Sequence, residues 1–207
     1  MAQTTKITLR SLTVIAFFCA ILGMAGRTGP ATAQPSLIPT QVQLVFPFSA
    51  SGNLAVRISA RIHGRCFAAS VADSGRPDAW RCMSGNRIYD PCFEGLEQNT
   101  AVVACLESPR TPAAVVLIPT GGMPRQAANK GSPLASPPWS LLLGNGASCG
   151  LFSGATFGLA GMRVNYGCAN GGYLIGDVDR SQPQWRVFYL GPRATVAMLV
   201  SVVTAYY

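Results

Sequence analysis

The sequence predicts an all-β fold, in which antiparallel hairpins form a small sandwich or barrel-like domain behind an N-terminal signal helix. Three observations predict this class. Six of the seven cysteines follow the signal, and 22 Gly and 15 Pro among 207 residues suit a turn-rich fold. Strand-like segments also recur between turn sequences. We expect about nine or ten strands, with little helix after the signal.

Residues 1–33 have the order of a secretory signal peptide. Lys6 and Arg10 precede an apolar stretch over 12–25, and small residues end at Ala33, where we expect cleavage. A membrane-spanning helix needs about 20 residues, and this stretch is shorter. Its length therefore favours a cleaved signal, and an uncleaved membrane anchor is the alternative. The sequence therefore predicts a secreted or periplasmic protein, with no transmembrane span in its mature part.

The remaining chain divides by composition. The predicted parts are a tether over 34–41, an N-terminal β half over 42–119, a linker or loop over 120–138 and a C-terminal β half over 139–207. The linker holds four Pro and three Gly and shows no periodicity, which is unusual within a compact domain.

Strand signals in the N-terminal half begin at 42–46, where Pro47 favours an edge position. Over 56–63, apolar residues alternate with Arg, Ser and His, which predicts a half-buried strand. The segment 74–83 suits either a short helix or a loop. Further strands are expected at 88–89, 101–106 and 113–118.

Two hairpins are predicted in the C-terminal half. Asn145-Gly146 separates strand-like runs over 139–143 and 147–152, and Asn-Gly is a strong hairpin signal. Gly171 and its neighbours turn 162–168 into 173–175. The last strands are expected at 185–190 and 195–206.

The cysteines of the mature chain are even in number, which indicates structural disulfides in an oxidising compartment. They are Cys66, Cys82, Cys92, Cys105, Cys149 and Cys168. Their repeat-like spacing favours sequential pairing among the fifteen pairings that six cysteines allow. With no Cys-x-x-Cys spacing and one histidine, the sequence predicts neither a metal site nor a cofactor.

The two halves repeat one pattern. Cys82-Met-Ser-Gly85 is followed by Asp90, and Cys168-Ala-Asn-Gly171 is followed by Asp177. Each pattern has another cysteine at a comparable distance before it. Two related disulfide-closed hairpins would produce this repeated pattern, and so would chance in a glycine-rich chain.

Motifs of hydrolases are present but incomplete. Ser148 lies in a Gly-x-Ser-x-Gly sequence, yet no helix is expected after it and His63 precedes it, against the order of that fold. The order of His63, an Asp and Ser148 matches chymotrypsin-like enzymes, but no Gly-Asp-Ser-Gly surrounds a serine. The sequence assigns no catalytic residue and favours a non-enzymatic protein.

The acidic residues give no firm site either. Asp177, Asp179 and Ser181 occupy the first, third and fifth positions of a calcium loop, but Gln182 and Phe188 replace its Gly and Glu. An ordinary turn at a strand end is the better interpretation. Nothing in the sequence brings two acids together as a glycosidase pair.

Positive charge marks one candidate site. Without residues 1–33 the chain has 13 basic and eight acidic residues, a net charge of +5. Arg57, Arg61, His63 and Arg65 recur at every second or fourth position, which places them on one strand face. This basic stripe is a possible anion-binding surface for envelope polymer or lipid, and no nucleic-acid partner is expected. The alternative is the solvated face of an ordinary strand.

Several segments resemble those of exported bacterial cysteine-containing proteins of unassigned function. They are Cys66–Ser70, Arg76–Cys82, Asn86–Phe93 and Asn165–Cys168, about half of the mature chain. The resemblance implies export and an extracytoplasmic domain, and it assigns no functional residue.

We therefore expect an exported, disulfide-stabilised β domain that acts as a non-enzymatic envelope-associated or ligand-binding module. The alternative is an extracytoplasmic hydrolase acting on envelope polymer. Ligand and oligomeric state do not follow from the sequence.

Overall fold

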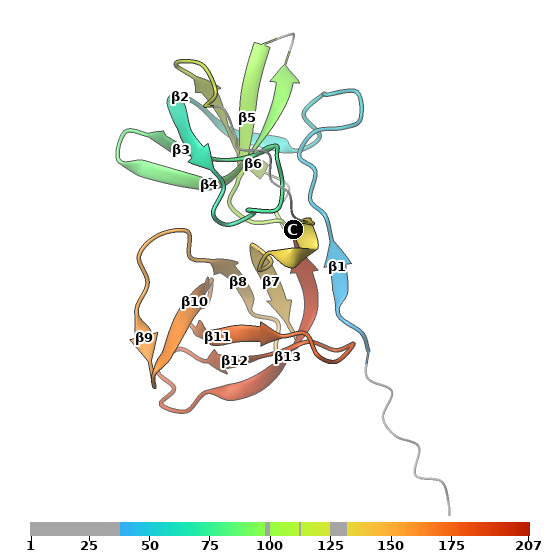
Figure 1. Ribbon diagram of the computed structural model, residues 1–207, viewed down its shortest axis with the longest axis vertical. Helices are drawn as coiled ribbons and strands as arrows, with labels where there is room; N and C mark the ends of the chain where they lie inside the picture. The colour runs from blue at the N-terminus through green and yellow to red at the C-terminus, as the bar shows by residue number, and fades with distance from the viewer. Residues whose placement is uncertain (1–37, 98–99, 112, 125–131) are drawn as a thin grey trace, which may run out of the picture. The chain divides into compact units, whose positions relative to one another are not determined.

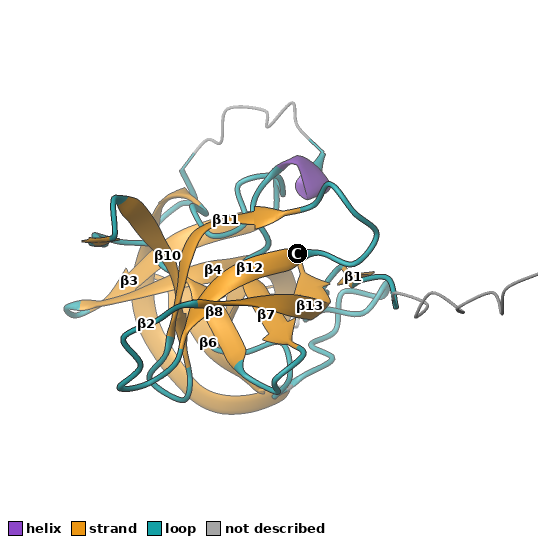
Figure 2. Cartoon of the chain, turned by 90° about the horizontal axis from the view of Figure 1, so that it is seen from below, coloured by secondary structure: helices purple, strands orange, loops and turns teal. Residues whose placement is uncertain are grey.

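The chain folds almost entirely into β-strands, as the sequence predicts. The computed structural model describes residues 38–97, 100–111, 113–124 and 132–207. The predicted signal peptide and its cleavage site lie outside these described residues. The 3-10 helix η1 (Pro133–Ala135) is the purple turn in Figure 2. Within the described ranges, no helix is long and apolar enough to cross a membrane.

The first barrel is a closed ring of five strands, in the upper part of Figure 1. These strands are β2 (Arg57–Ala69), β3 (Ala79–Ser84), β4 (Arg87–Glu97), β5 (Thr100–Leu106) and β6 (Ala113–Pro119). Successive strands pair antiparallel, and the parallel pairing of β2 with β6 closes the ring. Val103 and Leu117, both fully buried, belong to its core. Closure removes the free strand edges on which sheets aggregate.

The second barrel contains the strands of the predicted C-terminal half. They are β7 (Ser140–Leu143), β8 (Ser148–Leu151), β9 (Gly158–Leu159), β10 (Met162–Cys168), β11 (Tyr173–Asp179), β12 (Arg186–Leu190) and β13 (Met198–Tyr206). The sheet order is β13-β12-β11-β10-β8-β7, with β9 beside β10, and β13 pairs with β7 to close the ring. Leu141, Leu174 and Val202 are buried in its core.

Both predicted hairpins are confirmed. Gly146 turns β7 into β8 with φ of +83°, and Gly171 turns β10 into β11 with φ of +84°. Glycine adopts this left-handed conformation without the steric cost of a Cβ atom. The turn residues therefore fix the strand register on both sides.

The strand predicted at 42–46 belongs to a different barrel from the rest of its predicted half. It forms β1 (Gln41–Gln43), which pairs in parallel with β13 of the second barrel. The amide of Val45 donates to the carbonyl of Tyr207 at 2.7 Å and continues this contact. Figure 1 shows β1 in blue beside the red β13. The segment thus ties the start of the described chain to its end.

Three disulfides within the described residues confirm the sequential pairing. They join Cys66 to Cys82, Cys92 to Cys105, and Cys149 to Cys168. In each pair the cysteines lie opposite one another on neighbouring antiparallel strands. Each bond therefore staples two strands of the same barrel.

The repeated Cys-x-x-Gly pattern occupies equivalent turns. Gly85 turns β3 into β4 and Gly171 turns β10 into β11, both at positive φ. Asp90 and Asp177 then lie on the strands that follow, β4 and β11. The echo in the sequence thus corresponds to matching hairpins, one in each barrel.

The two barrels belong to one compact unit and share a buried cluster. Phe93 and Ala114 of the first barrel pack there with Trp139 and Tyr206 of the second. Burial of this apolar surface holds the barrels together.

Part of the predicted linker is held in place by neighbouring residues. Gly75 packs so closely on Pro133 that a Cβ atom would lie 2.4 Å from its Cα. Ser74 and Ser136 hydrogen-bond through their hydroxyls at 2.8 Å. The linker therefore reaches the second barrel along the 71–78 loop of the first, which forms turns. The sequence predicts a short helix or a loop over 74–83, and this is wrong for residues 79–83, which belong to β3 because they pair with β2 and β4. Residues 125–131 of the linker lie outside the described residues.

Candidate functional site

A groove lies where the two barrels meet, and it contains two adjoining cavities. The larger has a volume of about 740 Å³ and is lined by Val71 of the first barrel and by residues of β8, β10 and β11. The smaller has a volume of about 440 Å³ and lies between Asp90 and Trp139. Leu151 and Phe152 line both cavities, which makes them parts of one groove.

The walls of the larger cavity combine apolar and polar side chains in comparable measure. Val71, Met162 and Val178 line it, and the side chains of Val71 and Met162 are exposed. Phe152 packs against Gly167, where a Cβ atom would lie 2.7 Å from the ring. Apolar walls with a few fixed polar groups are typical of ligand sites.

The polar groups of this cavity come mainly from β10 and β11. The Asn165 amide donates to the backbone carbonyl of Gly176 at 3.0 Å and to Asp177 Oδ1 at 3.1 Å. These two bonds orient both side chains. Arg163 also lines the cavity and is exposed, so the site presents charges of both signs.

Arg180 secures the linker side of the groove. Its guanidinium donates to the carbonyls of Leu134 at 3.0 Å and Ser136 at 2.9 Å. The same group lies 5.0 Å from the ring centroid of Trp185, within the range of a cation–π contact. Arg180 therefore fixes the wall formed by η1.

The floor contains a buried tyrosine. Tyr166 donates its hydroxyl hydrogen to the carbonyl of Pro138 at 2.8 Å. Burial raises the pKa of Tyr166, so the phenol stays neutral and serves as a structural donor.

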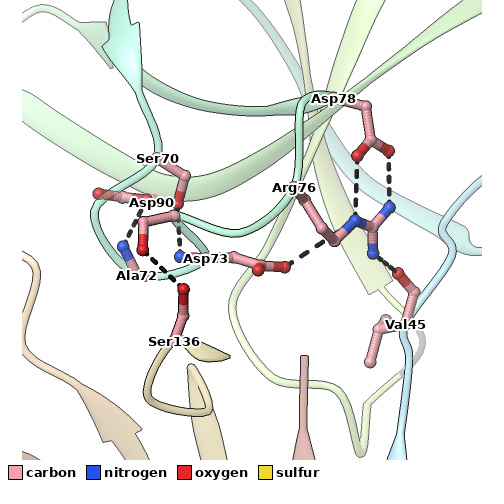
Figure 3. Close-up of polar contacts among 9 residues, drawn as sticks. Val45, Ser70, Ala72, Asp73, Arg76, Asp78, Asp90 and Ser136 are labelled. Atoms are coloured by element: carbon pink, nitrogen blue, oxygen red, sulfur yellow. Dashed lines mark hydrogen bonds and ion pairs between the residues drawn. The ribbon is translucent and has the colours of Figure 1, made fainter. Parts of the chain in front are cut away.

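Asp90 holds the loop that carries Val71, as Figure 3 shows. Its carboxylate accepts hydrogen bonds from the Ser70 hydroxyl, from the amide of Val71 at 3.2 Å and from the amide of Ala72 at 3.4 Å. The side chain of Asp90 is fully buried, with Arg81 Nε 3.9 Å away. Burial raises its pKa, and the hydrogen bonds partly offset that rise.

Arg76 fixes the other end of this loop (Figure 3). It donates to Asp78 at 2.6 Å and to the carbonyl of Val45, next to β1. Its guanidinium lies 4.7 Å from the ring centroid of Phe46 and 4.3 Å from that of Phe93. Arg76 therefore joins the segment that follows β1 to the first barrel.

Asp73 is the least satisfied charged group of the loop. Its side chain is 1% exposed, and Arg76 Nε lies 3.9 Å from its Oδ2. Burial raises its pKa from 3.8 to about 6, and the charges of Asp78 and Asp90 add to the rise. Asp73 therefore titrates in the mildly acidic range.

The hydrolase motifs do not form a site. Ser148 lines the smaller cavity. His63 is exposed on β2 of the other barrel and lines neither cavity of the groove. A general base must lie within hydrogen-bond reach of the proton that it removes, so this arrangement does not support a Ser–His pair.

The structure divides the predicted basic stripe. The register of β2 against β6 shifts after Ile58, and a one-residue shift reverses the face of the following side chains. Arg57 therefore lies on the opposite face from Arg61 and His63. Arg61, His63 and Arg65 keep the predicted row, and all three are exposed. Anion binding by this row stays a prediction.

The calcium-like sequence forms an ordinary turn. Asp179 Oδ1 accepts the amide of Ser181 at 2.9 Å, whereas Asp177 accepts from Asn165. Among the described residues, no group of three or more His, Cys, Asp or Glu side chains is placed to hold a metal ion.

Sequence reasoning did not identify the groove. Val71 and Phe152 carry no motif, and they meet only because the two barrels pack together. Two sequence signals include single residues of the groove: the repeated pattern includes Asp177, and the resemblance includes Asn165. Neither signal links these residues to a cavity.

Comparison with known proteins gave no match. The chain matches no family model, no curated protein and no solved structure.

Proposed function

We propose that the chain is an exported, non-enzymatic binding module, secreted or periplasmic, whose ligand binds in the groove between the barrels. The observation that carries this proposal is the exposed Asn165–Asp177 pair, held at 3.1 Å in the lining of a cavity that combines apolar and charged side chains. Polar groups held on strands give a site with little ordering cost on binding.

The disulfides support the exported location, because such bonds persist in oxidising compartments. Each of them lies within one barrel, so the groove between the barrels carries no covalent bridge.

The geometry favours binding over hydrolysis. His63 lines neither cavity of the groove, and the carboxylate of Asp90 is occupied by three donors of the loop that follows β2. Asp177 is an exposed carboxylate of the groove, suited to an electrostatic contact with a ligand.

Photo-crosslinking in producing cells tests the proposal. A benzophenone amino acid replaces Met162 at the groove, and the control places it at Ile88 of the first barrel. The two side chains are comparably exposed, at 39% and 47%. We expect a specific covalent adduct from position 162 and none from position 88. Equal adducts, or none at position 162, would contradict a groove ligand.

A further inference from the structure

The proposed function leaves the ligand open, and the groove residues narrow its chemistry. We propose that the ligand is an extended peptide with a basic side chain that binds the carboxylate of Asp177. This inference rests on the proposed function, because it assumes that the groove is the binding site.

The carboxylate of Asp177 has one oxygen available to bind a cation. Asn165 holds one carboxylate oxygen at 3.1 Å and leaves the second available, and the residue is exposed to the cavity. The ion pairs found within the described part of the chain involve Arg76, Arg81 and Arg87, and none of them includes Asp177. A lysine or arginine of the ligand would form a charge-assisted hydrogen bond there.

The walls favour a peptide over a glycan. Aliphatic side chains from both barrels, among them Val71, Leu151 and Val178, line the larger cavity. A polysaccharide carries hydroxyl groups along its whole length, and burying them against such walls without partners is costly. Peptide side chains of mixed character match a lining in which these aliphatic groups lie beside the carboxylate of Asp177 and the guanidinium groups of Arg163 and Arg180.

The shape favours a linear ligand. The two cavities adjoin at Leu151 and Phe152 and follow the contact between the barrels. An extended chain would occupy the larger cavity with its basic residue and continue toward Trp139 in the smaller one.

A random octapeptide display library tests this inference with the full exported protein. The wild type should enrich basic over acidic residues at one position by about tenfold, the ratio that corresponds to 1.4 kcal/mol. Asp177→Asn should remove that preference, and Asp177→Lys should reverse it toward acidic residues. Asp179→Asn is the matched control, because Asp179 is an exposed acid of the same strand outside the cavity lining.

Circular dichroism and unfolding midpoints confirm that each variant is folded. The inference is overturned if the library yields no enriched peptide, or if Asp177→Asn keeps the basic preference. A glycan or lipid adduct at position 162, without peptide enrichment, would overturn the peptide inference and leave the groove proposal standing. Failure of the crosslink itself would overturn both.

Discussion

The two barrels use the same sequence pattern for different purposes. Each has a cross-strand disulfide, a Cys-x-x-Gly turn and an aspartate on the next strand. The side chain of Asp90 in the first barrel is fully buried, and its carboxylate accepts from three donors of the loop that follows β2. Asp177 of the second is exposed and binds one side chain, Asn165.

The difference shows how an equivalent carboxylate becomes structural or available. A buried carboxylate needs its lone pairs satisfied within the protein, which removes it from ligand chemistry. An exposed one, oriented by a single amide, keeps capacity for a partner. The first barrel thus shapes one wall of the groove, and the second supplies its charge.

The largest expected effect is the loss of stability on removing the buried carboxylate of Asp90. Asp90→Ala leaves the Ser70 hydroxyl and two amides without their acceptor and Arg81 without its ion-pair partner, so the free energy of unfolding should fall by about 3 kcal/mol. Asp177→Ala should change it by less than about 0.5 kcal/mol. Urea denaturation of both variants measures this. Equal losses would show that the two aspartates are not used differently.

A second prediction concerns pH and the loop between the barrels. The pKa of Asp73 is raised from 3.8 to about 6, so the folded state favours the protonated carboxyl. Its contribution is complete below pH 3.8 and is lost as the pH rises through about 6. Relative to Asp73→Asn, the wild type should therefore lose up to about 3 kcal/mol of stability between pH 4 and pH 7.

Unfolding at a series of pH values gives this difference. Asp179→Asn is the control, because turn hydrogen bonds from Ser181 lower the pKa of Asp179, and its contribution is instead lost as the pH falls. A flat difference between the wild type and Asp73→Asn would contradict the account of Asp73.

The smallest effect is expected at the outer face of the first barrel. Arg61→Ala with Arg65→Ala should weaken retention on anionic vesicles at low salt by a few-fold, an effect that salt screens. Arg57→Ala should matter less, because the register shift turns that residue to the opposite face. Arg110→Ala with Arg193→Ala, two exposed residues elsewhere, controls for net charge. Unchanged retention in every variant would contradict anion binding by Arg61 and Arg65 and would show that this is the solvated face of an ordinary strand.

Much of the fold could be predicted from the sequence because its signals are local. Period-two alternation located β2, the turn at Gly146 located a hairpin, and cysteine spacing gave the disulfides. The pairing of β1 with β13 could not be predicted, because it joins residues at opposite ends of the described chain. Neither could the bulge after Ile58, which leaves the pattern of residue types unchanged.

The groove was beyond sequence reasoning for a related reason. Val71 belongs to one barrel and Phe152 to the other, and no periodicity or spacing relates them. In the sequence, Asp177 is part of a repeated pattern and of an incomplete calcium loop. The exposure of its carboxylate in the groove follows from tertiary packing, which cannot be derived from a single sequence.

The central claim is that the exposed carboxylate of the second barrel, and not the buried one of the first, contacts the ligand. A two-dimensional NMR titration with the best peptide from the display library tests this most directly. We predict shifts at the amides of Asn165, Asp177 and Phe152, no shift at the amide of Ile88, which lines neither cavity, and loss of the shift at position 177 in Asp177→Asn. Shifts confined to the first barrel, or unchanged shifts in Asp177→Asn, would contradict the claim.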